Sequence, residues 1–369
     1  MDGRPTDNIS QTSESNTMIQ ALINRYKRMR TAHYLRQTYQ YQYAFVGIGQ
    51  HSLTNLYPAL HYLGVPLKYI CVTSERKARL IERKFPSVKA TTSLDEILND
   101  EAVKGVFVSA SPSSHFSIAS QVLKSGRSLF IEKPPCHSLE ELDALTRLQR
   151  LHGAPVAMIG LQKRYTPAAQ LLKKRLDKER LINYDLHYLT GAYPEGNALL
   201  DLYIHPLDLV CYLFGKPEII AFQKVAEDSY LLMLQHPHIV GTLELSTAYT
   251  WTAAEESLKV CTRSGSYNLS QMEELTFSST SSSLLGVPVE KVLPRRPSVK
   301  YLYARNTFAP ILGGNQVYSL GYLGEIEAFA DAVEGRKRPV VTDLEAIQGT
   351  YQLMKEIQIN TDKQHLKAK

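Results

Sequence analysis

The sequence predicts an α/β protein with two domains, a doubly wound parallel sheet followed by an α+β domain with a mainly antiparallel sheet. Three observations lead to this prediction. The chain has 369 residues, which exceeds the size at which one hydrophobic core keeps growing. Short apolar runs alternate with helical patterns between residues 43 and 160, and one long helix and successive strand-like runs follow. We place the boundary between residues 162 and 163.

The first domain, residues 43–162, has the strand and helix alternation that is typical of parallel sheets with right-handed crossovers. Short apolar runs predict buried strands, and apolar residues three or four apart predict helices. Ligands of such sheets bind beyond the carboxyl ends of the strands. The expected strands are 43–46, 67–72, 106–108, 129–131 and 156–159, and the expected helices are 53–63, 75–85, 116–124 and 139–151.

The second domain, residues 163–369, changes to strand-like runs separated by turn residues, which predicts a mainly antiparallel sheet. A low-complexity loop is expected at 278–283. The expected strands are 219–225, 230–234, 241–245, 258–261 and 267–269, and the expected helices are 199–213, 323–334 and 344–359.

The first 42 residues fit neither domain. Residues 1–16 are polar with almost nothing to bury, so we expect a disordered tail. Residues 17–42 predict a basic amphipathic helical extension, because apolar residues recur at helical spacing among cations without a single acid. A membrane surface or an acidic partner can bind such a helix, but we favour a solvated helix docked on its own domain.

Composition limits the classes of function. The net charge of +6 is mild for this length and too diffuse to argue for a nucleic-acid binder, and an anionic small molecule as ligand would explain it equally well. The four cysteines form no C-x-x-C pair, which favours buried reduced thiols over disulfides or zinc. No apolar stretch approaches the roughly 20 residues that span a bilayer. We therefore expect no membrane span and a cytoplasmic location.

A glycine-rich turn follows the first expected strand. Gly47, Gly49 and Ser52 form the pattern G-x-G-x-x-S directly before a helix. The first glycine permits the tight turn, the second lets the backbone approach a pyrophosphate, and the helix N-terminus at Gln50 and His51 offers amides. Serine is small, yet it departs from the usual third Gly or Ala. A purely structural turn is the alternative, and within this series of elements we favour a dinucleotide site.

The end of the second strand bears on the choice of cofactor. An NAD site usually has an acid there that holds the ribose 2′-hydroxyl. This chain has Val72 and Thr73, followed by Ser74 and Arg76, which tolerate a 2′-phosphate. We therefore favour NADP over NAD. The alternative is that Ser74 merely caps the next helix and that Arg76 is solvated.

Small residues follow the third expected strand and open a helix. We expect Ser109, Ser111 and Pro112 at the same edge of the sheet as Gly47, where small side chains let a cofactor pass. His115 lies in the first turn of that helix and joins these cofactor candidates. A capping or packing role is its alternative.

Three residues from distant segments are candidates for catalysis. Lys133, within Glu132-Lys133-Pro134, places an ammonium at the end of a strand. Asp201 and His205 lie four residues apart, so on a helix they face the same way. An imidazole titrates near neutrality and can remove a hydroxyl proton, while the ammonium stabilises oxyanion charge. Such a pair can also ligate zinc, which we rank lower because no further His or Cys stands at ligand spacing.

The chain from residue 43 to 359 resembles the Gfo/Idh/MocA oxidoreductases, which typically use NAD or NADP to oxidise or reduce sugars, cyclic polyols and sugar nucleotides. Six landmarks in order are far more specific than any one of them. They are Gly47-Ile48-Gly49, Ser111-Pro112-x-x-His115, Glu132-Lys133-Pro134, Lys163-Arg164-Tyr165-Thr166-Pro167, Asp201-x-x-x-His205-x-x-Asp208 and Gly321-Tyr322-Leu323-Gly324-Glu325-Ile326.

The resemblance implies a Rossmann fold and an NAD(P)-dependent dehydrogenase that acts on a CH–OH group of a sugar-like substrate. It also implies that Lys133 contacts the reacting oxygen, that His205 is the general acid/base, and that Asp201 orients substrate or imidazole. Glu132 joins the cofactor candidates. The antiparallel sheet is expected to form a homodimer or homotetramer.

Arg164 and Tyr203 complete the substrate candidates. Tyr203 stands where the family usually has glycine, so its phenol is expected to narrow the substrate site or to stack on a ring. For Asp208, a buried polar network that braces the helix is a serious alternative to a role in the site.

A second hypothesis comes from another class, a non-catalytic dinucleotide sensor or partner subunit that retains the fold. The departures at Ser52 and Tyr203 and the basic N-terminal extension favour it. The presence of both Lys133 and His205 opposes it, because a sensor needs neither of them.

Overall fold

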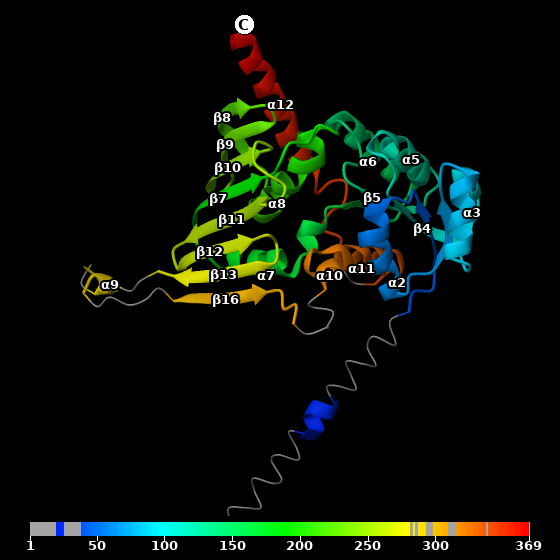
Figure 1. Cartoon of the computed structure of the whole chain (residues 1–369), viewed down its shortest axis with the longest axis horizontal. Coiled ribbons are helices and arrows are strands. Elements are labelled where there is room, and N and C mark those ends of the chain that lie inside the picture. Colours follow the sequence, from blue (N-terminus) through cyan, green and yellow to red (C-terminus); the bar gives the residue numbers. More distant parts are fainter. Residues whose placement is uncertain are drawn as a thin grey trace, which may run out of the picture.

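The computed structural model describes residues 20–25, 38–280, 283–284, 287–292, 298–308, 315–336 and 339–368. Two halves lie side by side, a large sheet on the left of Figure 1 and a smaller helix-covered sheet on the right. Within the predicted extension, residues 20–25 are helical and exposed. The predicted tail 1–16 and the rest of 17–37 lie outside the described residues.

The first half contains a six-stranded sheet in the order β3-β2-β1-β4-β5-β6, and all its pairings are parallel. The prediction of a doubly wound parallel sheet is confirmed. The short β3 was not predicted, because its three residues are partly polar and exposed. The strands are β1 (Gln42–Val46), β2 (Leu67–Cys71), β3 (Lys89–Thr91), β4 (Val103–Val108), β5 (Ser128–Glu132) and β6 (Ala157–Gly160).

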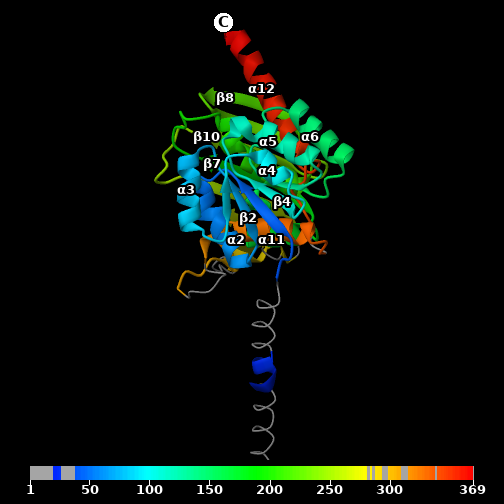
Figure 2. The ribbon, with the colours of Figure 1, turned by 90° about the vertical axis from the view of Figure 1, so that its right-hand side faces the viewer.

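Helices cover both faces of this sheet, as Figure 2 shows. Alternate strand residues face opposite sides: Val106 and Leu129 pack toward α5 and α6, and Phe107 and Phe130 pack toward α2. The one-turn α4 was not predicted. The helical segments are η1 (Ser52–Leu56), α2 (Tyr57–Leu63), α3 (Glu75–Lys84), α4 (Leu94–Leu98), α5 (Pro112–Lys124) and α6 (Leu139–His152).

A late segment of the chain completes the first half. Helix α11 (Tyr322–Val333) packs with α2 against the sheet, and the Phe329 ring meets Phe107 edge to face at 4.9 Å between centroids. Burial of such aromatic clusters dominates core energetics. The division at residue 162 assigns α11 to the second domain, although its apolar face is buried in the first.

The second half contains an eight-stranded sheet in the order β16-β13-β12-β11-β7-β10-β9-β8. Six of its neighbouring pairs are antiparallel and β7–β10 is parallel, so the mainly antiparallel prediction is confirmed. Strands β7, β13 and β16 were not predicted. The strands of this sheet are β7 (Leu181–Leu189), β8 (Glu218–Ala226), β9 (Ser229–Gln235), β10 (Val240–Ser246), β11 (Glu255–Thr262), β12 (Gly265–Ser270), β13 (Glu274–Ser279) and β16 (Val299–Ala304). The short strands β14 (Ser283–Leu284) and β15 (Val287–Pro288) pair with each other in a separate antiparallel sheet.

Helices cover one face of the large sheet, where α7, α8 and α12 bury its apolar residues. The predicted helix 199–213 is observed as a π-helical turn, η3, that continues into α8. No helix in the described part of the chain is long and apolar enough to cross a membrane. The remaining helical segments are η2 (Gln162–Tyr165), α7 (Pro167–Leu176), η3 (Leu199–Tyr203), α8 (Ile204–Phe214), α9 (Val289–Val292), α10 (Gln316–Ser319) and α12 (Gln348–Ala368).

Candidate active site

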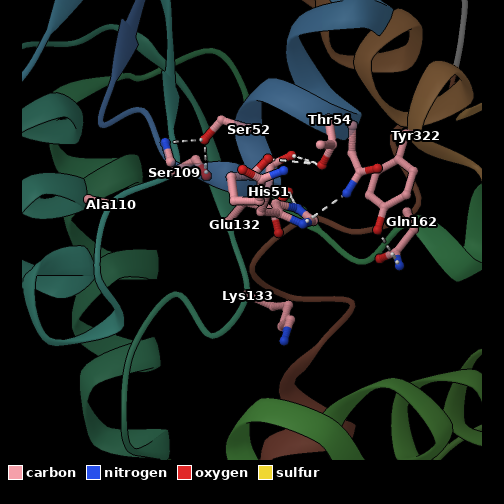
Figure 3. A network of polar contacts seen from close by, with 12 residues as sticks. His51, Ser52, Thr54, Ser109, Ala110, Glu132, Lys133, Gln162 and Tyr322 are labelled. Atoms are coloured by element: carbon pink, nitrogen blue, oxygen red, sulfur yellow. Dashed lines mark hydrogen bonds and ion pairs between the residues drawn. The ribbon is translucent and has the colours of Figure 1, made fainter. Parts of the chain in front are cut away.

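The glycine turn is fixed by a neighbouring loop. Gly47 has a φ of +83°, and a Cβ there would lie 2.5 Å from the carbonyl oxygen of Ser109, so only glycine fits. A Cβ at Gly49 would meet nothing within 4 Å, which leaves this backbone open to a ligand. Ser52 accepts a hydrogen bond from Gly49 N at 3.3 Å and donates one to Ser109 Oγ at 3.0 Å (Figure 3). The serine therefore ties the two loops together.

A pocket of about 570 Å³ opens beside this turn, at the carboxyl ends of β1, β2 and β4. Its walls include much of the predicted cofactor set, and its volume and open glycine backbone fit part of a dinucleotide. Of that set, Ser74, Arg76, Pro112, His115, Glu132 and Lys133 do not line it. The predicted residues that do line it are Gly47, Gly49, Gln50, His51, Thr73, Ser109 and Ser111.

The end of β2 divides into residues that face this pocket and residues that do not. Thr73 lines it, and so does Lys77, which was not predicted. Ser74 accepts a hydrogen bond from Lys77 N at 3.4 Å as the N-cap of α3, so the capping alternative describes it. Arg76 is exposed. The cation that reaches the pocket is Lys77, one helical position further on.

His115 is packed inside the protein, in agreement with the alternative to its role as a cofactor residue. The side chain is buried, and its ring nitrogens lie 2.8 Å from the Pro134 carbonyl oxygen and 3.0 Å from that of Ala110. Burial lowers the pKa of the imidazole. His115 therefore joins the two loops that follow β4 and β5.

Lys133 reaches from the first half to the second. Its Nζ donates to the backbone carbonyl of Asp201 at 2.5 Å, and Figure 3 shows the side chain directed away from His51. Burial lowers the pKa of the ammonium, while Glu132 and Asp201 oppose this effect. A half-buried ammonium with one carbonyl partner has further donors for a substrate oxygen.

His205 lies in the first turn of α8, where the charge of Lys133 acts on its ring. It is 8% exposed, and its Nδ1 has no hydrogen-bond partner in the described part of the chain. Burial, and then the cations Lys133 and Lys163 together with His51, hold the pKa of the imidazole well below its ordinary value. The ring is therefore neutral and can accept a proton.

Asp201 takes a different position from the one expected at four-residue spacing. Its Oδ2 accepts from Asn197 N at 2.9 Å and lies close to the Tyr193 ring at Gly196. Residues Leu199–Tyr203 are π-helical, which changes the angular spacing on which the α-helical prediction depended. Asp201 therefore braces the preceding loop with its carboxylate and holds Lys133 with its carbonyl.

Arg164 and Tyr203 lie outside the site, contrary to expectation. Arg164 is 3% exposed and binds Asp208 through Nε at 2.8 Å and Nη2 at 2.6 Å. This pair forms the bracing network that was the alternative for Asp208. Tyr203 is fully buried, with its hydroxyl bonded to the carbonyl of Asp228 and its ring edge-on to Tyr188. The polar groups of both side chains bind other parts of the protein, so neither side chain is directed at a substrate.

Lys163 is a site residue that the sequence prediction missed. Its Nζ pairs with Glu256 and lies 4.8 Å from the centre of the Tyr188 ring, and its charge acts on both Lys133 and His205. The sequence feature that could have identified Lys163 is its position directly before Arg164 in one of the family landmarks. Glu325 in the last landmark was also missed, although it is fully buried and its carboxyl oxygens have no hydrogen-bond partner among the described residues.

A glycine turn at a parallel sheet edge, with an ammonium and a neutral imidazole beyond it, defines a dinucleotide-binding oxidoreductase. Residues 41–160 match the oxidoreductase family with an NAD-binding Rossmann fold, Gfo/Idh/MocA. The predicted resemblance to this family is therefore confirmed for residues 41–160.

Relatives extend this likeness beyond the Rossmann domain. The chain is 24% identical over 296 residues to scyllo-inositol 2-dehydrogenase (NAD(+)) of Bacillus subtilis, which covers 76% of this chain and 82% of the relative. Other matches are shorter, such as 26% identity over 57% of the oxidoreductase YceM of Salmonella typhimurium. The family and these relatives are dehydrogenases and oxidoreductases, as predicted.

Solved structures share the fold of both halves. A dehydrogenase from Chromobacterium violaceum superposes with a TM-score of 0.74 at 19% identity, covering 89% of this chain and 98% of the other. A levoglucosan dehydrogenase, in complex with NADH and levoglucosan, gives a TM-score of 0.73 at 17% identity and the same coverage. The predicted fold class is therefore confirmed.

Proposed function

We propose that this protein transfers hydride between NADP or NAD and a secondary alcohol of a sugar, cyclic polyol or sugar nucleotide. The observation that carries the proposal is that the charge of Lys133 acts on the buried, neutral imidazole of His205, whose Nδ1 has no hydrogen-bond partner among the described residues. His205 takes the hydroxyl proton, and Lys133 binds the oxygen and stabilises its negative charge. When bound, the nicotinamide supplies the hydride chemistry.

The cofactor is held by the glycine turn and the neighbouring loops. Gly49 brings open backbone to the pyrophosphate, and Ser109 and Ser111 form the opposite wall of the pocket. Thr73 and Lys77 lie where an acid would favour NAD, so we propose a preference for NADP. In this assignment Lys77 replaces Arg76 as the cation for the 2′-phosphate.

The substrate class follows from chemistry and from relatives. A site that combines an ammonium, an imidazole and the Lys163–Glu256 pair offers several polar groups to a polyhydroxylated ring. Relatives named for scyllo-inositol and levoglucosan support the same class.

The open face of the large sheet supports a homodimer or homotetramer. Large apolar side chains on this face are exposed, including Leu231 at 45% and Met233 at 39%, and they border an apolar groove of about 370 Å³. Exposed apolar surface of this kind marks protein interfaces. We therefore propose a second copy of this chain as its occupant.

A substrate panel tests the function. Cofactor absorbance is followed with NAD and NADP across polyols, sugars and sugar nucleotides, with wild type, Lys133→Ala and the exposed control Lys124→Ala. We expect turnover in wild type and in the control, and its loss in Lys133→Ala. Equal turnover in all three proteins would contradict the assigned chemistry. Cofactor binding without turnover on any substrate would favour the sensor hypothesis.

A further inference from the structure

Two connecting segments meet at the end of β7. Residues 190–198, which we call the strap, run from β7 to η3, and residues 247–254 form the loop that joins β10 to β11. Because β10 is parallel to β7 and β11 is antiparallel to it, this loop crosses the end of β7. Backbone hydrogen bonds fasten the segments together. Thr190 N donates to the Ser246 carbonyl at 2.8 Å, and Tyr249 N donates to the Thr190 carbonyl at 2.9 Å.

The strap adjoins both lysines of the site. Before its start, the Tyr188 ring lies under the ammonium of Lys163, at 4.8 Å from Nζ to the ring centre. The cross-strand partner of Tyr188 is Glu256, which pairs with the same lysine and follows the loop 247–254. After the end of the strap, the Asp201 carbonyl accepts the hydrogen bond from Lys133 Nζ. The strap therefore connects the surroundings of the two ammonium groups.

Tyr193 stands on the strap beside Asp201. A Cβ at Gly196 would lie 2.3 Å from Asp201 Oδ2 and 2.9 Å from Tyr193 Cε1, so the bare glycine lets the carboxylate and the ring approach each other. Burial, and then the Asp201 carboxylate, raise the pKa of the Tyr193 phenol. Because the carbonyl of Asp201 holds Lys133, the Tyr193 ring belongs to the rim of the site.

Trp251, the only tryptophan of the chain, packs on the same strap. Its indole N–H donates to the Ala192 carbonyl at 2.9 Å, directly before Tyr193. A Cβ at Gly191 would lie 2.5 Å from Trp251 Cδ1, so the indole lies against bare backbone. The side chain is nevertheless 52% exposed. An aromatic ring that is fixed in place and open on half of its surface offers a preformed face to a ligand.

We propose that Trp251 and Tyr193 form an aromatic platform on which the ring of a sugar or cyclic polyol packs by its C–H face. This inference rests on the proposed function and names the part of the substrate that is recognised. Such a ring carries its hydroxyls around the edge and C–H bonds on its faces, so one face buries apolar surface against an aromatic side chain. The hydroxyl edge stays free for the ammonium groups. An acyclic polyol has no such face, so Trp251 is a specificity-determining residue.

Tryptophan fluorescence tests the platform, because all of the tryptophan signal comes from Trp251. Wild type is titrated with scyllo-inositol, levoglucosan, acyclic sorbitol and uridine diphosphate. NADH or NADPH is present, so that a bound alcohol cannot be oxidised. We expect a saturable change of emission with at least one of the two cyclic compounds and none with sorbitol or uridine diphosphate. No response to either cyclic compound, an equal response to sorbitol, or a response to uridine diphosphate alone would overturn the proposal.

Two variants separate a face for the substrate from a brace for the strap. Trp251→Ala removes the ring, whereas Trp251→Phe keeps a ring and removes only the N–H that binds Ala192. On the cyclic substrate with the highest turnover, we expect Trp251→Ala to raise KM about tenfold with kcat nearly unchanged, the loss of one stacked ring. We expect Trp251→Phe to recover most of this loss, and the exposed control Tyr62→Ala on α2 to behave as wild type. Equal losses in both Trp251 variants would overturn the proposal, because the N–H would then be responsible.

The failure of the platform and the failure of the proposed function give different results. Turnover of a cyclic substrate by wild type, without any response of the indole, would overturn the platform and leave hydride transfer in place. A saturable response of the indole to a cyclic compound, without turnover on any substrate, would support the platform and contradict hydride transfer.

Discussion

Helix α8 carries two buried polar side chains one turn apart, and they differ in how far their hydrogen-bonding groups are satisfied. Asp208 accepts two hydrogen bonds from Arg164 and a third from Thr350 at 3.0 Å. His205 has an Nδ1 with no partner among the described residues and faces cations rather than a carboxylate. A satisfied buried group stabilises a fold, whereas an unsatisfied one in a cleft indicates chemistry with a ligand.

The largest expected effect is on turnover. Lys133→Ala is expected to lower kcat/KM by about 10²–10⁴-fold, because it removes the group that stabilises the oxyanion. Its free energy of unfolding should change by less than about 1.5 kcal/mol, since it loses one hydrogen bond. Steady-state kinetics and denaturant unfolding of the same preparation measure both. If the loss of unfolding free energy in Lys133→Ala were large enough to explain its loss of activity, Lys133 would be a stabilising residue like Asp208 rather than a catalytic one.

Asp208→Ala should show the opposite behaviour. It leaves the Arg164 guanidinium buried without its carboxylate, which costs about 3–5 kcal/mol of unfolding free energy. Urea denaturation measures this loss, and Asp177→Ala, on the exposed end of α7, is the control. An unchanged midpoint for Asp208→Ala would show that the Arg164–Asp208 pair does not brace the fold.

The pH dependence of stability reports on His205. Its folded pKa lies below the ordinary value of 6.5, so at pH below 6.5 the unfolded state binds a proton that the folded state does not. Stability is therefore fully present above pH 6.5 and falls by up to about 1.4 kcal/mol per pH unit below it, until His205 protonates. His205→Gln should flatten the curve of unfolding free energy in this window. Parallel curves for the two proteins would contradict the depressed pKa.

A smaller effect is expected at the cofactor end. Lys77→Ala should weaken NADP binding by about tenfold and leave NAD binding nearly unchanged, because a charge-assisted hydrogen bond to the 2′-phosphate is lost. Calorimetry with both cofactors measures this, and Arg76→Ala is the matched control on the same helix. Equal losses for NAD and NADP would remove Lys77 from the 2′-phosphate site.

The sequence predicted the backbone of the site better than its side chains. Gly47 was predictable because a tight turn with positive φ has few solutions, and the predicted strands of the first sheet were found. Strand β7 was missed although residues 183–188 alternate between polar and apolar side chains, the pattern of a half-buried strand. Spacing alone could not place Asp201, because a π-helical turn changed its direction.

Side-chain direction explains the remaining errors. Arg164 and Lys163 are neighbours in one landmark, but Arg164 points into a bracing network and Lys163 toward the site. Tyr203 replaces a glycine of the family, yet its ring turns into the core of the second domain. The departures at Ser52 and Tyr203 first favoured a non-catalytic sensor. Both residues have structural partners and leave Lys133 and His205 in place.

The most direct test of the account is the protonation state of His205. Nitrogen-15 NMR of the imidazole rings, with the His205 signals assigned by comparison with His205→Gln, follows each histidine as pH falls. The account predicts that His205 stays neutral at a pH below 6.5, the ordinary value of an imidazole. A His205 ring that titrates at this ordinary value would contradict the claim that the site keeps a neutral imidazole as its proton acceptor.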